Sequence, residues 1–149
     1  MKKAFIFDLD DTLYREKDFV YEGFREVCKH LSKKYNLKEE KLFKTTIEVL
    51  ETQGRGKIFN ILCEKYNIKE DIKKLVNIYR NVKPKIELYE DAKYILDKFK
   101  NKFKLGIITD GKSSVQWNKI KALNLNKMVD KIIVSDDYGK EYWKPNQHV

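Results

Sequence analysis

The sequence has few of the residues that mark secreted, fibrous or membrane proteins. Its 149 residues include only two cysteines, two prolines and six glycines. Cys28 and Cys63 do not form a C-x-x-C pair, which argues against a disulfide framework or a zinc site and predicts reduced core cysteines in a cytoplasmic protein. No apolar run approaches about 18 residues, so we expect no membrane-spanning helix. The first acid, Asp8, comes too early to leave room for the apolar core of a signal peptide.

Arginine is also scarce, although the chain is basic. Only four of the 32 basic residues are arginines, and the formal net charge is +9 with a pI near 9.3. A basic balance raises the chance of a nucleic-acid partner. However, the lysines are spread along the chain with acids among them, which is typical of a solvated surface. We therefore expect no dedicated nucleic-acid site.

The apolar residues predict a folded α/β protein. They make up 42% of the chain, with 13% aromatics, which excludes a disordered chain. Short apolar runs at 4–7, 103–109 and 131–134 predict buried strands. A helical pattern over 88–99 precedes the second strand, and another follows it, with Ser113 or Ser114 as its expected N-cap. Right-handed crossovers then make the three strands parallel.

Residues between the first strand and Pro84 predict an inserted helical subdomain. Four apolar stripes at helical spacing occur between about residues 18 and 83, which is too many for one crossover connection. Pro84 is expected to end the last of these helices. The predicted division is therefore an α/β core made of residues 1–17 and 84–149, with an all-α cap over 18–83.

Polar residues follow the first two predicted strands, and a lysine follows the third. Asp8 and Asp10 are two residues apart after the first strand, so in extended backbone their side chains share one side. Two carboxylates at such a short distance repel each other and favour a divalent cation between them. Thr109-Asp110-Gly111 ends the second strand, where a glycine turn into a helix suits an anion. Lys144 comes later and could reach back toward a phosphate.

Two other families of acid-rich sites fit less well. A phosphoacceptor receiver domain needs its acceptor aspartate at the end of a middle strand, but the region after the first strand is helical through Tyr79. A calcium-binding EF loop starting at Asp8 would require glycine at the sixth position and glutamate at the twelfth. The chain has Leu13 and Phe19 there.

The motifs in their order resemble those of the haloacid dehalogenase (HAD) superfamily of hydrolases. The first motif corresponds to Asp8-Leu9-Asp10-Asp11-Thr12, the second to Thr109-Asp110-Gly111 and the third to Lys144-Pro145. The resemblance covers the whole chain and is to the phosphatase branch, whose helical C1-type cap is inserted after the first motif. It implies a Rossmann-like core with a parallel sheet.

The resemblance also implies a mechanism and a site. Asp8 would be the nucleophile that forms an aspartyl-phosphate, and Asp10 the general acid and base. Thr109, Asp110 and Gly111 would bind the phosphate, and Lys144 would hold nucleophile and phosphate together. Mg²⁺ would bind the Asp8 carboxylate and the Asp10 carbonyl. The dehalogenases of the superfamily lack an acid at the position of Asp10, so the resemblance implies a Mg²⁺-dependent phosphatase that acts on a small phosphorylated metabolite.

One part of the family pattern has no counterpart in the sequence. The fourth, acidic motif would follow Lys144, and the sequence printed here ends at Val149. This leads us to expect a truncated chain whose first strand forms an exposed edge open to self-association. An alternative is that the chain binds a phosphate ester or a partner without efficient turnover.

The cap is expected to form a lid over the strand ends and to help choose the substrate. Its turn Gln53-Gly54-Arg55-Gly56-Lys57 carries two cations on a flexible backbone. Arg55 is therefore a candidate substrate contact, although a solvated turn between two helices explains the same residues. The sequence does not specify which phosphate ester is bound.

Overall fold

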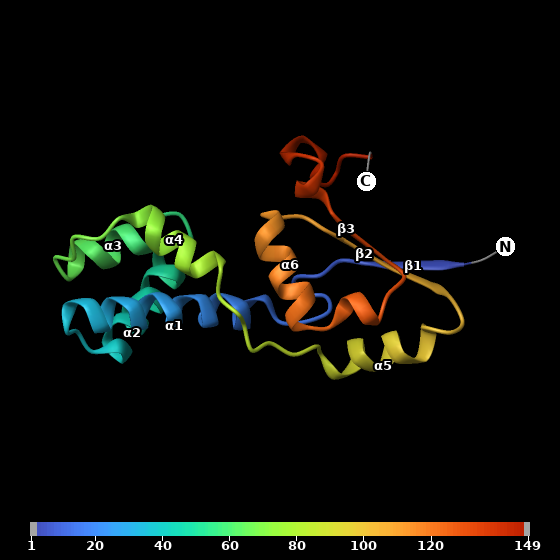
Figure 1. Ribbon diagram of the computed structural model, residues 1–149, viewed down its shortest axis with the longest axis horizontal. Helices are drawn as coiled ribbons and strands as arrows, with labels where there is room; N and C mark the ends of the chain where they lie inside the picture. Colours follow the sequence, from blue (N-terminus) through green and yellow to red (C-terminus); the bar gives the residue numbers. More distant parts are fainter. Residues whose placement is uncertain (1–2, 148–149) are drawn as a thin grey trace. The chain divides into compact units, whose positions relative to one another are not determined.

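The computed structural model describes residues 3–147 (Figure 1). Strands and helices alternate along the chain, except that four consecutive helices follow the first strand before the helix that leads to the second. The elements in chain order are β1 (Ala4–Phe7), α1 (Glu16–Tyr35), α2 (Glu39–Gln53), α3 (Ile58–Lys65), α4 (Ile72–Arg80), α5 (Glu90–Phe99), β2 (Lys104–Thr109), α6 (Ser113–Ala122) and β3 (Lys131–Val134). By its contacts, the chain divides into two compact units, Val20–Val82 and the residues on either side of it. We propose that these units are the cap and the core.

The three strands form one parallel sheet in the order β1-β2-β3, which confirms the predicted α/β class. β2 is central and pairs in register with both neighbours, for example Phe7 with Ile107 and Thr109 with Val134. Leu105 and Ile107 of β2 are fully buried. Because all three strands run the same way, their carboxyl ends meet at one edge of the sheet.

β1 is less covered than the other strands within residues 3–147. It pairs only with β2 in that range, and its Phe5 and Ile6 side chains are 39% and 59% exposed. Phe5 nevertheless packs on Phe99 and Phe103, with ring centroids 5.2 and 5.0 Å away. This aromatic cluster fixes β1 to the turn that leads from α5 into β2.

The start of α6 differs from the prediction. Its N-cap is Lys112, which makes no capping bond through its side chain, and Ser113 is already the first helical residue. The Ser113 N–H instead donates to the Asp136 carboxylate at 2.8 Å, and the Ser113 hydroxyl donates to Asp137. The expected serine cap was wrong because acids just after β3 satisfy the helix end through a tertiary contact.

The Val20–Val82 unit is a four-helix unit with its own apolar core. Its fully buried residues include Val27, Leu31, Leu42 and Leu62. Cys28 and Cys63 are free and buried there, as predicted. Burial raises the pKa of the Cys28 thiol to about 12 and also raises that of Cys63, so both stay protonated near neutral pH. α4 ends at Arg80, before Pro84, as predicted.

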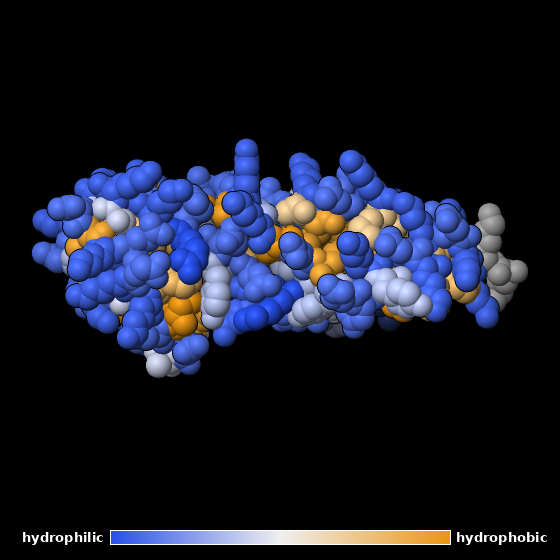
Figure 2. Space-filling model, turned by 90° about the horizontal axis from the view of Figure 1, so that it is seen from below, coloured by the Kyte–Doolittle hydropathy of each residue, from blue (hydrophilic) through white to orange (hydrophobic). Residues whose placement is uncertain are grey.

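The face of the molecule that Figure 2 shows is mostly hydrophilic, with apolar patches between the polar side chains. This is the pattern that scattered lysines and acids predict. Within residues 3–147, no helix has both the length and the apolar character that crossing a bilayer requires.

A buried glutamate ties α1 to the segment before α4. The Glu70 side chain is only 6% exposed and lies 3.0 Å from His30 Nε2 and 2.8 Å from Lys34 Nζ. Lys74 approaches its other oxygen at 3.9 Å. The hydrogen bonds from Lys34 and His30 lower the pKa of Glu70 to about 2. Its charged form is therefore favoured in the folded state.

This contact predicts a pH dependence of stability. Because the pKa of Glu70 is lower in the folded state, its contribution is complete above the unfolded value of about 4.3 and is lost as pH falls toward 2. We expect Glu70→Gln to lower the unfolding free energy at pH 7 and to flatten its decline between pH 4.5 and 2, measured by urea denaturation. Glu48→Gln, at an exposed acid 3.8 Å from Lys65, is the control and should change neither. Equal effects of the two substitutions would contradict the assignment.

Candidate active site

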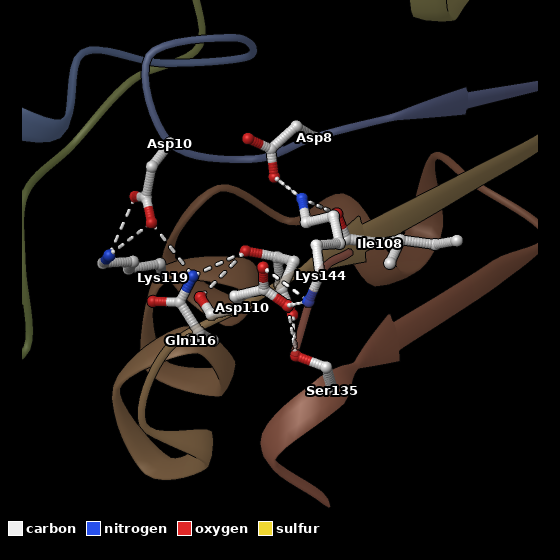
Figure 3. A network of polar contacts seen from close by, with 9 residues as sticks. Asp8, Asp10, Ile108, Asp110, Gln116, Lys119, Ser135 and Lys144 are labelled. Carbon is white, nitrogen blue, oxygen red and sulfur yellow. Dashed lines mark hydrogen bonds and ion pairs between the residues drawn. The ribbon is translucent and has the colours of Figure 1, made fainter. Parts of the chain in front are cut away.

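The candidate site lies where β1 and β2 end (Figure 3). Asp8 directly follows β1, and Thr109 is the last residue of β2. The loop after β3 brings Lys144 to the same edge, where its Nζ lies 2.9 Å from Asp8 Oδ1. Residues separated by more than 100 positions in the sequence thus meet in one place.

The Asp8–Lys144 ion pair faces solvent. The two side chains are 46% and 41% exposed, so a ligand can reach both. Lys144 Nζ also donates to the Ile108 carbonyl at 3.2 Å, which directs the ammonium over the end of β2. A solvent-facing ammonium group at this edge can neutralise the charge of an anionic ligand such as a phosphoryl group.

The Asp110 carboxylate has a different task from the one suggested by its place in the second motif. It accepts hydrogen bonds from the Lys144 backbone N–H at 3.2 Å and from the Ser135 hydroxyl at 2.5 Å. These two hydrogen bonds therefore connect the residue after β2 to the residue after β3 and to the Lys144 loop. Only the backbone of Asp110 is left to offer a donor to a phosphate.

Asp10 lies in a second, more enclosed cluster. Its carboxylate oxygens accept from Lys119 Nζ at 2.8 and 3.0 Å, and Oδ1 also accepts from the Tyr14 hydroxyl at 2.6 Å. The Lys119 side chain is 4% exposed, against 25% for Asp10. Lys119 Nζ also lies 4.8 Å from the centre of the Phe19 ring. The ammonium is thus held between a carboxylate and an aromatic face.

Tyr14 acts in this cluster as a hydrogen-bond donor. The residue is fully buried, and burial, followed by the nearby Asp10 carboxylate, raises its pKa well above the ordinary value. The phenol therefore stays protonated and can only give its proton to Asp10. Local strand-like pairing of Tyr14 with Asp10 and Leu88 holds the loop in this shape.

Gln116 connects the two clusters. Its Nε2 donates to Thr109 Oγ1 at 2.7 Å and to Asp10 Oδ2 at 3.0 Å. Gln116 and Lys119 are one turn apart on α6, so both reach the strand ends from the same helix face.

The third acid of the first motif serves the local fold. Asp11 has a positive φ of 55°, and its carboxylate accepts the Glu16 N–H at 2.9 Å, where α1 begins. This is the role of a helix cap. Gly111 has a φ of 114°, in the region that favours glycine, which agrees with the tight turn predicted after β2.

Only part of a metal site can be recognised in residues 3–147. They contain no group of three or more His, Cys, Asp or Glu side chains that could hold a metal ion. The half-exposed Asp8 carboxylate is nevertheless a ligand of the type that Mg²⁺ prefers, and Mg²⁺ often binds through one or two carboxylates and water. The donor set fits Mg²⁺ but is incomplete.

The structure brings together most of the residues singled out in the sequence. Asp8, Asp10, Asp110 and Lys144 lie together near the strand ends (Figure 3), Thr109 ends β2 and Gly111 follows it by two residues, whereas Arg55 belongs to the Val20–Val82 unit. There Arg55 lines a pocket of about 380 Å³ together with Arg80. The sequence analysis assigned no role in the site to Tyr14, Gln116, Lys119 or Ser135, which contact the candidate residues. Polar residues at i and i+3 on the predicted helix were the available signal for Gln116 and Lys119.

The sequence matches the family of haloacid dehalogenase-like hydrolases over residues 5–149. The chain belongs to this family. A relative from Methanocaldococcus jannaschii, a glyceraldehyde 3-phosphate phosphatase, is 31% identical over 147 residues, which are 93% of this chain and 64% of that protein. A protein of the same name from Methanopyrus kandleri is 28% identical over all of this chain and 67% of its own length. The chain thus spans about two thirds of these relatives.

Solved structures of the HAD family share the fold. The magnesium-bound structure of YfnB from Bacillus subtilis has a TM-score of 0.61 at 20% identity, covering 95% of this chain and 69% of that one. A HAD-superfamily hydrolase of subfamily IA from Geobacter sulfurreducens has a TM-score of 0.57 at 16% identity, covering 89% and 62%. At these identities the comparison concerns the fold alone.

The different surroundings of the two HAD aspartates predict different stabilities of their amide variants. Asp10→Asn leaves the buried Lys119 ammonium without a full counter-charge, so we expect it to lower the unfolding free energy by about 2 to 3 kcal/mol. Asp8→Asn removes an exposed pair and should cost less than about 1 kcal/mol. Urea denaturation at pH 7 measures both. If Asp8→Asn proved the more destabilising, the contrast between the two pairs would be wrong.

Proposed function

We propose that this HAD-family protein hydrolyses phosphomonoesters through an aspartyl-phosphate on Asp8. The observation that carries the proposal is the approach of Lys144 Nζ to 2.9 Å from Asp8, at the end of the strand beside Thr109. This arrangement offers a nucleophile, a cation and a hydroxyl donor to one phosphoryl group. Its family membership supports the proposal.

The first step forms the covalent intermediate. An Asp8 carboxylate oxygen bonds to phosphorus while the ester P–O bond breaks, and Asp10, which has to enter this step protonated, gives its proton to the leaving oxygen. Lys144 and Thr109 stabilise the phosphoryl oxygens. Mg²⁺, held by the Asp8 carboxylate and the Asp10 carbonyl, would add further charge neutralisation when bound.

The second step releases phosphate. Asp10, now deprotonated, takes a proton from a water molecule whose oxygen attacks phosphorus, and the bond from phosphorus to Asp8 breaks. This restores the carboxylate of Asp8 and the proton of Asp10. The contacts of Asp10 with Lys119, Tyr14 and Gln116 fix the position from which it exchanges that proton.

The substrate we propose is a small phosphorylated metabolite. The relatives named as glyceraldehyde 3-phosphate phosphatases make this triose phosphate the first ester to test. A second candidate function is phosphate-ester binding without efficient turnover. Among the described residues, Asp8 is the one side-chain carboxylate that we propose as a ligand to the metal. A Mg²⁺ ion held by one carboxylate and mostly by water is expected to bind weakly, which favours this second function.

Substitution of the proposed nucleophile provides the main test. Asp8→Asn should reduce Mg²⁺-dependent release of phosphate from an aryl phosphate to below about a thousandth of the parent rate, because the amide is a poor nucleophile. Removing Mg²⁺ with EDTA should have a similar effect on the parent. Beryllofluoride should form a complex on Asp8 in the parent and not in the variant. Turnover by Asp8→Asn near the parent rate would overturn the mechanism.

Measurements of turnover and of phosphate binding by the parent protein distinguish the two candidate functions. Turnover of about 1 s⁻¹ or more on glyceraldehyde 3-phosphate or an aryl phosphate, within the ordinary enzyme range, supports hydrolysis. Saturable binding of inorganic phosphate without such turnover supports the binding function.

Arg55 tests whether the Val20–Val82 unit takes part in substrate choice. If Arg55 contacts the substrate, Arg55→Ala should raise the KM for some phosphate esters about tenfold while leaving others unchanged. Arg25→Ala is a matched control, since Arg25 lies in the same unit, 4.1 Å from the Phe43 ring centre and 3.5 Å from Glu40. Unchanged KM values across a panel of esters would exclude the contact.

A further inference from the structure

Gln116 stands out because a buried amide joins two residues with different proposed tasks. It is 1% exposed and lies on α6, away from the three sequence motifs. Figure 3 shows its amide between Asp10 and the end of β2. The distances are 3.0 Å to Asp10 Oδ2 and 2.7 Å to Thr109 Oγ1.

The chemistry of the amide fixes which atom faces the site. A glutamine amide has two N–H donors on nitrogen and an oxygen that only accepts. In the structure Asp10 accepts from Lys119 and Tyr14 as a carboxylate, which offers no donor, so in this state the amide nitrogen has to face Asp10. Both N–H groups are then used, one for Asp10 and one for Thr109.

This use of the amide gives Thr109 a direction. The Thr109 hydroxyl oxygen already accepts a hydrogen bond from the Gln116 amide, so the hydroxyl proton must point elsewhere. The acceptor within reach is the Asp110 carbonyl, at a long 3.4 Å. A phosphoryl oxygen above the strand end would be a better acceptor for that proton.

Gly111 leaves the space that Gln116 needs. A Cβ atom on Gly111 would lie 3.3 Å from Gln116 Cδ, which is closer than most real contacts of this kind, and at an ordinary contact distance of 3.5 Å from Oε1. The glycine of the second motif therefore allows the amide to lie across the turn. Turn, amide and hydroxyl form one packed unit.

We propose that Gln116 is a positioning residue that makes Thr109 a donor directed at the phosphoryl group and holds Asp10 beside it. This inference rests on the proposed function only for the identity of the ligand, because it concerns phosphate binding and not turnover. Gln116 contacts Asp10 and Thr109 but not the nucleophile Asp8, and in the proposed steps it exchanges no proton and binds no phosphoryl oxygen. It acts through Thr109 and Asp10.

A double-mutant cycle on the 149-residue chain tests the coupling to Thr109. Gln116→Leu, which keeps a similar volume without donors, should weaken binding of inorganic phosphate about tenfold, the size of one net hydrogen bond to a charged group. Thr109→Val should weaken it by a similar factor. If Gln116 acts through Thr109, adding Gln116→Leu to Thr109→Val should change the affinity less than about twofold. Isothermal titration calorimetry measures all four proteins.

A second variant separates positioning from simple packing. Gln116→Glu keeps the shape of the side chain but replaces the donor by an acceptor beside Asp10, so phosphate affinity should fall at least as far as in Gln116→Leu. Exposed Ser114 on the same helix gives the control, Ser114→Ala, which should bind like the parent. Thermal unfolding midpoints verify that each variant is folded.

Each outcome decides the proposal. Loss of affinity in Gln116→Leu and Gln116→Glu that disappears in the Thr109→Val background supports it. Parent-like binding by Gln116→Glu, or an equal loss with and without the Thr109 hydroxyl, overturns it. Phosphate binding by a parent that hydrolyses no ester would refute the proposed hydrolysis, and the affinities of the variants would still decide this inference. A folded parent that binds no phosphate would refute the inference itself.

Discussion

The pairing of β2 with strands on both sides determines where the site can form. Parallel strands in one sheet present their carboxyl ends together, so the loops after β1, β2 and β3 must share one edge. The fit at the centre is close, because a Cβ atom on Gly106 would lie only 2.8 Å from Ile6 Cδ1. A side chain there would require the exposed end of the Ile6 side chain to move away from β2.

The site at this edge combines two ion pairs with opposite physical character. Asp8 and Lys144 are exposed, so their attraction is weakened by water and both remain open to an incoming ligand. Asp10 faces a lysine that is almost fully removed from solvent and supported by an aromatic ring. Such a pair holds a group in place at a cost in desolvation. One pair is therefore suited to exchange of partners and the other to fixed geometry.

The sequence predicted the elements whose signals are local. Apolar runs marked the strands, and the acids after 4–7 and the Thr109–Gly111 turn marked the edge where parallel strands end. The supporting residues were not predicted, because their roles depend on tertiary contacts. Lys119 is one of many lysines, and only the packing of α6 against the strand ends distinguishes it from a surface residue. The expected serine cap failed for the same reason, since the Asp136 carboxylate comes from a different part of the chain.

The loop that carries Lys144 is anchored by its main chain. The Asp110 carboxylate accepts a hydrogen bond from the backbone N–H of Lys144, while the ammonium of the same residue contacts Asp8. The position of the loop and the charge that it delivers are therefore set by different atoms of one residue. Any amino acid with a backbone N–H could preserve the anchor at this position, but only a long cationic side chain could also form the ion pair with Asp8. The position of the loop therefore does not depend on which side chain residue 144 carries. Only the ion pair with Asp8 requires a long cationic side chain there.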